Sequence, residues 1–175
     1  MSEIDTFQNG RSSRDFAIPA AAMFPAAERL VGVGFRCWLQ GFQTSDIGCW
    51  ELAWEEISRV VGQQAAKPLM TELACWVRAV QDSAERRIEV FPAQSRRFCR
   101  DECLAISMVA ASQHSTCPAF RACAVALLGC NDIDDAIEGA EGFARCLREA
   151  GQMLSPGTIF MGASLVTPSI RAGRC

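Results

Sequence analysis

Apolar residues recur every three or four positions along most of the chain, a pattern that predicts amphipathic helices. The clearest case runs over residues 47–61, where the apolar positions are Ile47, Trp50, Trp54, Ile57 and Val61. Thr44-Ser45-Asp46 can cap this helix, and Gly62 can end it. Similar patterns predict five more helices, at about 25–42, 68–84, 95–113, 118–129 and 131–148.

No alternating strand pattern occurs outside Ile88–Phe91, and the chain has no internal repeat. The connections are short, which favours antiparallel neighbours. A chain of 175 residues suits one domain with its own core. The sequence therefore predicts an all-α, single-domain antiparallel helical bundle of five or six helices over residues 23–155. A flexible N-terminal tail (1–22) and an irregular C-terminal tail (156–175) are expected to flank the bundle.

The stretch from Cys99 to Cys130 has long apolar runs that few charges interrupt. A helix that is apolar all round is buried on more than one side. We therefore expect the hairpin over 103–129 to be the innermost part of the bundle. The tryptophans fall on predicted inner faces, where core packing is favoured over stacking on a cofactor: Trp38, Trp50, Trp54 and Trp76.

Composition narrows the class of protein. Half of the residues are hydrophobic and 21% are charged, which is typical of a globular protein. A net charge of −3 and a pI of about 5.2 argue against a nucleic-acid partner. No apolar run reaches the roughly 20 residues of a membrane span, and residues 1–18 lack a signal peptide. We therefore expect a cytoplasmic, bacterial protein whose ten cysteines are reduced.

Four residues form the first candidate site, a metal centre: Cys99, Cys103, His114 and Cys117. Cys99 and Cys103 share a helix face, and two thiolates suit Cu(I) or half of a zinc site. Spacing opposes this interpretation, because His114 lies eleven residues after Cys103, about 16 Å along a helix. The favoured interpretation is that buried thiols fill the core as small apolar groups.

Two further chemical interpretations concern a nucleophile and an acidic cluster. Cys117, next to Pro118 at a helix start, could act as a nucleophile with His114 as its base, although such a histidine more often caps the preceding helix.

Four acids on one helix could bind Mg²⁺, but no second acidic pair accompanies them, so a solvated helix start is favoured: Asp134, Asp135, Glu138 and Glu141. A di-iron bundle is excluded, because it needs two Glu-x-x-His motifs.

Five arginines around one predicted loop, here called the arginine rim, form the strongest candidate binding site: Arg86, Arg87, Arg96, Arg97 and Arg100. Arg96 and Arg97 would lie in the first turn of the helix predicted from Ser95, where positive charge opposes the helix dipole. An anion or an acidic partner bound there would relieve that repulsion. The alternative is an ion pair between Arg97 and Asp101.

Few residues here could build an active site. The chain has one histidine, no tyrosine, no glycine-rich phosphate loop and no paired acidic motif. We therefore predict a non-catalytic binding, regulatory or assembly module without a cofactor, which binds a protein partner or a small anionic ligand through the arginine rim. A homodimer could also cover the apolar faces. The alternative is a cysteine-based metal-binding or thiol redox-sensing bundle.

Overall fold

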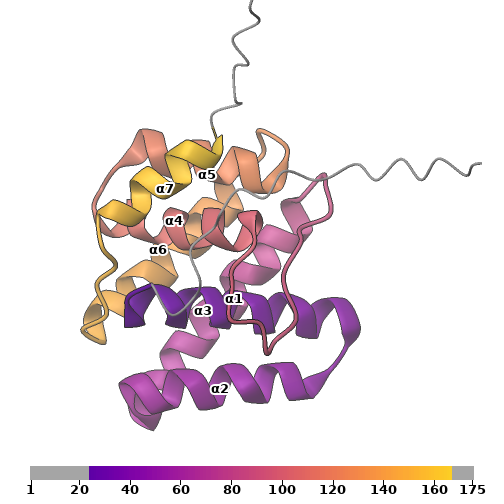
Figure 1. Ribbon diagram of the computed structural model, residues 1–175, viewed down its shortest axis with the longest axis vertical. Helices are drawn as coiled ribbons and strands as arrows, with labels where there is room; N and C mark the ends of the chain where they lie inside the picture. Colours follow the sequence, from indigo (N-terminus) through magenta and orange to yellow (C-terminus); the bar gives the residue numbers. More distant parts are fainter. Residues whose placement is uncertain (1–23, 167–175) are drawn as a thin grey trace, which may run out of the picture.

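The computed structural model describes residues 24–166, and the regular structure in this range is helical (Figure 1). This confirms the all-α class. Seven helices lie in the described part, where five or six were predicted. They are α1 (Ala26–Thr44), α2 (Ile47–Val61), α3 (Gln63–Ser83), α4 (Arg100–Gln113), α5 (Cys117–Leu128), α6 (Asp134–Glu149) and α7 (Gly157–Val166). Among them, none is both long and apolar enough to cross a membrane.

The additional helix is α7, within the segment 156–175 that was predicted to be irregular. Its sequence is almost entirely small or apolar and therefore has no periodic pattern. It packs on α4 and α5. At the closest point, a Cβ added to Gly162 would lie only 2.4 Å from Cβ of Ser107. The helix is thus stabilised by tertiary contact. The predicted N-terminal tail (1–22) and residues 167–175 of the predicted C-terminal tail lie outside the described residues.

Helix α4 lies at the centre of the molecule. Every residue from Asp101 to Ala111 is buried, and α4 contacts α1, α5, α6 and α7. The expectation that this part of the chain is innermost is therefore confirmed for α4. Its hairpin partner α5 is only half buried, because Arg121 and Val125 are exposed.

Two helices begin at positions that differ from the prediction. Helix α4 starts at Arg100 instead of Ser95, for a reason given below. Helix α3 starts at Gln63, so Pro68 lies inside the helix. Proline lacks the N–H that would bond to the carbonyl four residues earlier, here that of Gln64. Gln64 is exposed, so water can bind that carbonyl instead.

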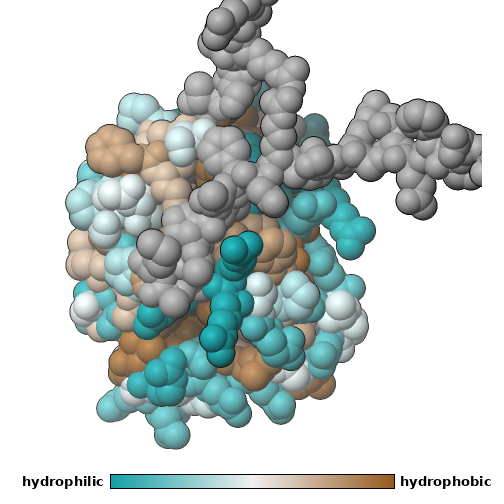
Figure 2. Space-filling view, viewed as in Figure 1, coloured by the Kyte–Doolittle hydropathy of each residue, from teal (hydrophilic) through white to brown (hydrophobic). Residues whose placement is uncertain are grey.

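Helix α2 has the predicted bounds, but only part of its predicted apolar face is buried. Its buried residues are Cys49, Ala53 and Ile57, whereas Ile47 is 64% exposed. Trp50 and Trp54 are only partly buried, so the predicted apolar stripe lies at the edge of the contact. The smaller side chains let α2 pack closely on its neighbours. Figure 2 accordingly shows hydrophobic patches among hydrophilic ones over the lower part of the molecule, where α2 lies.

Glycines in α1 allow close packing. A Cβ at Gly41 would lie 2.3 Å from Nε1 of Trp50, whose ring stacks on Trp38 with centroids 5.4 Å apart. A Cβ at Gly32 would lie 2.5 Å from the ring of Phe98. The absence of a side chain at these two positions therefore admits an aromatic ring against the helix backbone.

We expect Gly32→Ala to lower the free energy of unfolding by about 1–3 kcal/mol, the usual cost of overpacking a core. Alanine otherwise stabilises a helix relative to glycine by roughly 0.5–1 kcal/mol, so the predicted sign is opposite to that of intrinsic propensity. Urea denaturation measures the change. The control is Gly157→Ala at the exposed start of α7, where the nearest atom would be 3.3 Å away. An equal or smaller loss for Gly32→Ala would contradict the packing argument.

Candidate functional site

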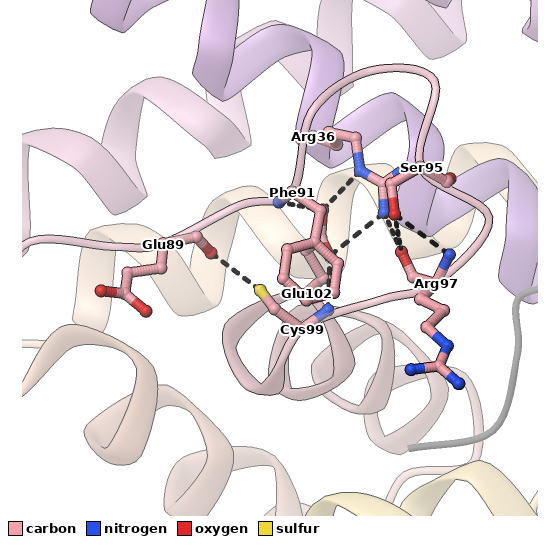
Figure 3. A network of polar contacts seen from close by, with 7 residues as sticks. All are labelled: Arg36, Glu89, Phe91, Ser95, Arg97, Cys99 and Glu102. Carbon is pink, nitrogen blue, oxygen red and sulfur yellow. Dashed lines mark hydrogen bonds and ion pairs between the residues drawn. The ribbon is translucent and has the colours of Figure 1, made fainter. Parts of the chain in front are cut away.

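The loop over residues 84–99, here called the arginine loop, joins α3 to α4 and carries four of the five arginine-rim residues. Under it lies an ion pair between Arg36 of α1 and Glu102 of α4 (Figure 3). Nε of Arg36 is 2.6 Å from one carboxylate oxygen of Glu102, and Nη2 is 3.2 Å from the other. Both side chains have 0% exposure.

Arg36 also binds the main chain of the arginine loop. Its guanidinium donates to the carbonyl of Ser95 at 2.8 Å and to the carbonyl of Arg97. It lies over the ring of Phe98, 5.0 Å from the centroid. Two of the carbonyls that would begin a helix at Ser95 are thus bonded to a side chain, and the loop stays non-helical.

Glu102 determines where α4 begins. Its carboxylate accepts the N–H of Cys99 at 2.6 Å, which completes a capping box with Cys99 at the N-cap. The same carboxylate accepts the N–H of Phe91 at 3.3 Å. Glu102 therefore binds both the part of the loop that follows α3, here called the first arm, and the part that precedes α4, here called the second arm. The helix starts directly after Cys99.

Asp101 holds the first arm of the loop in a similar way. It accepts two hydrogen bonds from Arg86, at 2.9 and 2.5 Å, and one from the N–H of Glu89 at 2.9 Å. Arg100 lies 3.5 Å from the same carboxylate. The ion pair predicted between Arg97 and Asp101 is therefore replaced by pairs with two other arginines.

The arginine rim divides into two groups. Arg86 and Arg100 neutralise Asp101, and Arg100 also donates to the carbonyl of Leu165. Arg87, Arg96 and Arg97 are exposed, and their guanidinium groups bind no other residue within 24–166. Figure 3 shows the Arg97 guanidinium pointing away from the buried network. Figure 2 shows both hydrophilic and hydrophobic side chains near the centre of this view. We call these three residues the free arginines.

The dipole argument for Arg96 and Arg97 was wrong, because both residues precede α4 and do not lie in its first turn. Their interest instead comes from exposure on a loop whose main chain is held by buried charged groups. Loops on rigid supports are common positions for binding residues.

A cavity of about 350 Å³ lies beside the first arm of the loop. Seven residues line it: Gln43, Arg87, Ile88, Glu89, Val90, Phe91 and Cys99. The Gln43 amide donates to the carbonyl of Ile88 at 3.4 Å, and the Cys99 thiol donates to that of Glu89 at 3.0 Å. One free arginine, Arg87, therefore stands at the wall of a cavity.

The residues of the predicted metal centre are not brought together. Helix α4 is unbroken from Arg100 to Gln113, so Cys103 and His114 lie near opposite ends of it. Cys99 and Cys103 are buried, whereas Cys117 is exposed. Among residues 24–166, no group of three or more His, Cys, Asp or Glu side chains is placed to hold a metal ion, and this covers the acids of α6.

Most of the thiols near the core are held in the protonated form. Burial, with Glu102 nearby, raises the pKa of Cys99 to about 12, and burial beside Cys99 does the same for Cys103. Burial also raises the pKa of Cys37 and that of Cys123 to about 11. A protonated thiol is a poor nucleophile and a poor metal ligand, so these four cysteines act as apolar core residues at neutral pH.

His114 and Cys117 are not bonded to each other. His114 is the C-cap residue of α4, and its Nε2 lies 2.8 Å from the carbonyl of Leu154. That nitrogen therefore binds the main chain before α7 and does not face the thiol. Cys117 is exposed at the first position of α5.

Sequence reasoning missed the two residues that organise the site, Arg36 and Glu102. One signal was available, because Arg36 is the only charged residue between Arg29 and Asp46, in an otherwise largely apolar stretch. A charge in that setting requires a partner. The sequence alone could not identify Glu102, which lies 66 positions further along the chain.

Comparison with known proteins adds no assignment: no family model, curated protein or solved structure matches this chain.

The buried ion pair gives a stability prediction. We expect Glu102→Gln or Arg36→Met to lower the free energy of unfolding by about 3–5 kcal/mol, because each leaves one charge buried without its partner. Urea denaturation measures the loss. The control is Arg59→Ala, which breaks a pair with Glu56 whose side chains are 69% and 47% exposed and should cost about 0–1 kcal/mol. If the free energy of unfolding fell equally at the Arg36–Glu102 and Arg59–Glu56 pairs, burial of the Arg36 pair would have no effect on stability.

The buried thiols predict a loss of stability in alkali. Above pH 9.0, the ordinary thiol pKa, the unfolded chain releases these protons while the native state keeps them up to about pH 11–12. The native state then binds more protons, so stability present below pH 9 falls as pH rises, by about 1.4 kcal/mol per pH unit for each thiol.

Urea denaturation over a pH series measures how the free energy of unfolding falls with pH. Cys103→Ser should make that slope shallower by the contribution of one thiol. The control is Cys75→Ser, at an exposed position, which should leave the slope unchanged. A slope that is the same in both variants would rule out a contribution from Cys103.

Proposed function

We propose that this protein is a non-catalytic recognition module that binds an acidic surface of a partner protein through the free arginines of the arginine loop. The observation that carries the proposal is the division of the arginine rim. Arg86 and Arg100 pair with Asp101, whereas Arg87, Arg96 and Arg97 are exposed without an acidic partner within residues 24–166.

Local charge supports an acidic partner. The arginine loop contains four arginines and two glutamates, a formal excess of two positive charges, in a chain whose net charge is −3. Because Asp101 lies in α4 and is occupied by two arginines, it does not screen the free ones directly. A positive patch attracts acidic surfaces and steers them towards the loop.

Preorganisation supports binding by this loop. Arg36, Asp101 and Glu102 together bind the main chain of the loop on both arms. A loop that is already ordered loses less conformational entropy on association. Arginine is also enriched in the residues that dominate protein interfaces, since its planar group pairs well with carboxylates.

Affinity capture with three versions of the protein tests this function. Wild type is compared with Arg87→Ser/Arg96→Ser/Arg97→Ser and with a control that removes three exposed arginines elsewhere, Arg121→Ser/Arg145→Ser/Arg148→Ser. We expect partners that both the wild type and the control retain to be lost from the loop variant by more than tenfold, since three lost charge-assisted contacts at about 1 kcal/mol each correspond to roughly a hundredfold.

Thermal unfolding should show both triple variants to be folded. The three loop side chains form no ion pair within residues 24–166, and the control loses only the exposed pair between Arg121 and Asp134. Addition of inorganic phosphate separates a small-anion ligand from a protein partner, since a true anion site would be blocked by phosphate at low concentration. Equal capture by the loop variant and the control would refute the proposed function.

A further inference from the structure

The first arm of the arginine loop has one edge bound to α4 and one edge open. From Arg87 to Pro92 the chain contains neither helix nor turn. The N–H groups of Glu89 and Phe91, two residues apart, both donate to acids of α4. The carbonyl of Glu89 accepts the Cys99 thiol on the same side. The same alternation occurs in a β-strand, in which the N–H and C=O groups of every second residue point towards the same edge.

Val90 lies between these two residues, so in an extended chain its N–H and carbonyl point towards the opposite edge. Neither its N–H nor its carbonyl bonds to any residue within 24–166, and Val90 lines the cavity. On the same edge, the carbonyl of Ile88 accepts only the long contact of 3.4 Å from Gln43. Unpaired main-chain groups at the edge of an extended segment are the groups that bind an added strand.

We infer that the partner contributes an extended peptide that pairs as a β-strand with the main chain of Val90, in the cavity beside residues 87–91. The inference rests on the proposed function and specifies how the partner binds. A carbonyl of the peptide would accept a hydrogen bond from the N–H of Val90, and an N–H of the peptide would donate to the Val90 carbonyl. The cavity, at about 350 Å³, provides room for one or two peptide side chains beside this pair.

The side chains around the open edge determine which peptide fits. Arg87 favours an acidic residue beside it, and Phe91, 38% exposed, favours an apolar one. Glu89 lies between them and is also exposed, so a neutral or basic residue is expected opposite it. The peptide must lack proline at the position that pairs with Val90, since proline has no N–H to donate. The expected ligand is therefore a short extended segment with one acid and one apolar residue on the same face.

A library of random short peptides displayed on phage, selected on the full chain, provides the probe. One selected peptide is then made with and without N-methylation at alternating main-chain nitrogens. We expect methylation at one set of positions to weaken binding about fivefold to tenfold, the effect of one lost hydrogen bond, and methylation at the other set to have little effect. The amide of Val90 should also exchange with solvent more slowly when the peptide is bound.

The matched variants are Val90→Pro and Val90→Ala. Val90→Pro removes an N–H that has no internal partner within the described residues, and proline is compatible with an extended chain, so folding should persist. Val90→Ala removes the side chain but keeps the N–H. Val90→Pro should weaken binding by tenfold or more, and Val90→Ala by clearly less. Should Val90→Pro unfold, the methylated peptides still decide the question.

The outcomes distinguish this inference from the proposed function. Peptides that need the free arginines but tolerate both N-methylation patterns and Val90→Pro would support the function and overturn strand pairing. Selection that yields no peptide dependent on Val90 or Arg87 would overturn strand pairing as well, while the affinity capture still judges the function. Loss on Val90→Pro with no effect of Arg87→Ser would support strand pairing and count against recognition by charge.

Discussion

The buried ion pair between Arg36 and Glu102 is the interaction on which the architecture around α4 depends. Removal of two charges from water costs several kcal/mol for each ion, and direct attraction alone seldom offsets that cost. Here the remaining hydrogen-bonding capacity of both groups is used by main chain: two carbonyls bind the guanidinium and two N–H groups bind the carboxylate. The pair therefore joins α1, α4 and the loop over 84–99 into one polar network inside an apolar core.

The same solution recurs at the opposite end of α4. Gln113 binds the carbonyls of Ala144 and Gln152 and accepts the N–H of Leu154. Glu28, fully buried in α1, accepts the N–H of Ser155 and the hydroxyl of Thr158 at the start of α7. Irregular segments carry main-chain groups that no helix satisfies, and side chains from helix ends supply the partners. Both irregular connections are thus held against the helices by buried polar residues.

Periodicity predicted the existence of most helices because each buries one face, and α2 has the bounds that its pattern indicated. It could not predict which of the apolar residues are most deeply buried: Cys49, Ala53 and Ile57 are buried, whereas Ile47 is exposed and Trp50 only partly buried. The start of α4 and the helix α7 depend on distant partners. The exposed arginines were identifiable from their number, but the division between paired and free ones depends on Asp101 and is a property of the fold.

That division has a consequence for recognition. If all five arginines were free, like charges would repel one another within the loop, and the hydrogen bonds between Arg86 and Asp101 would be absent. If all were paired, the loop would be rigid but neutral. Asp101 pairs with Arg86 and Arg100 only, and the buried pair holds the main chain, so positive charge remains at the three exposed arginines. Val90 lines the same cavity as Arg87, and within residues 24–166 its main chain is unbonded. A rigid support, free charge and an open edge within one short segment are the features that an extended acidic partner requires.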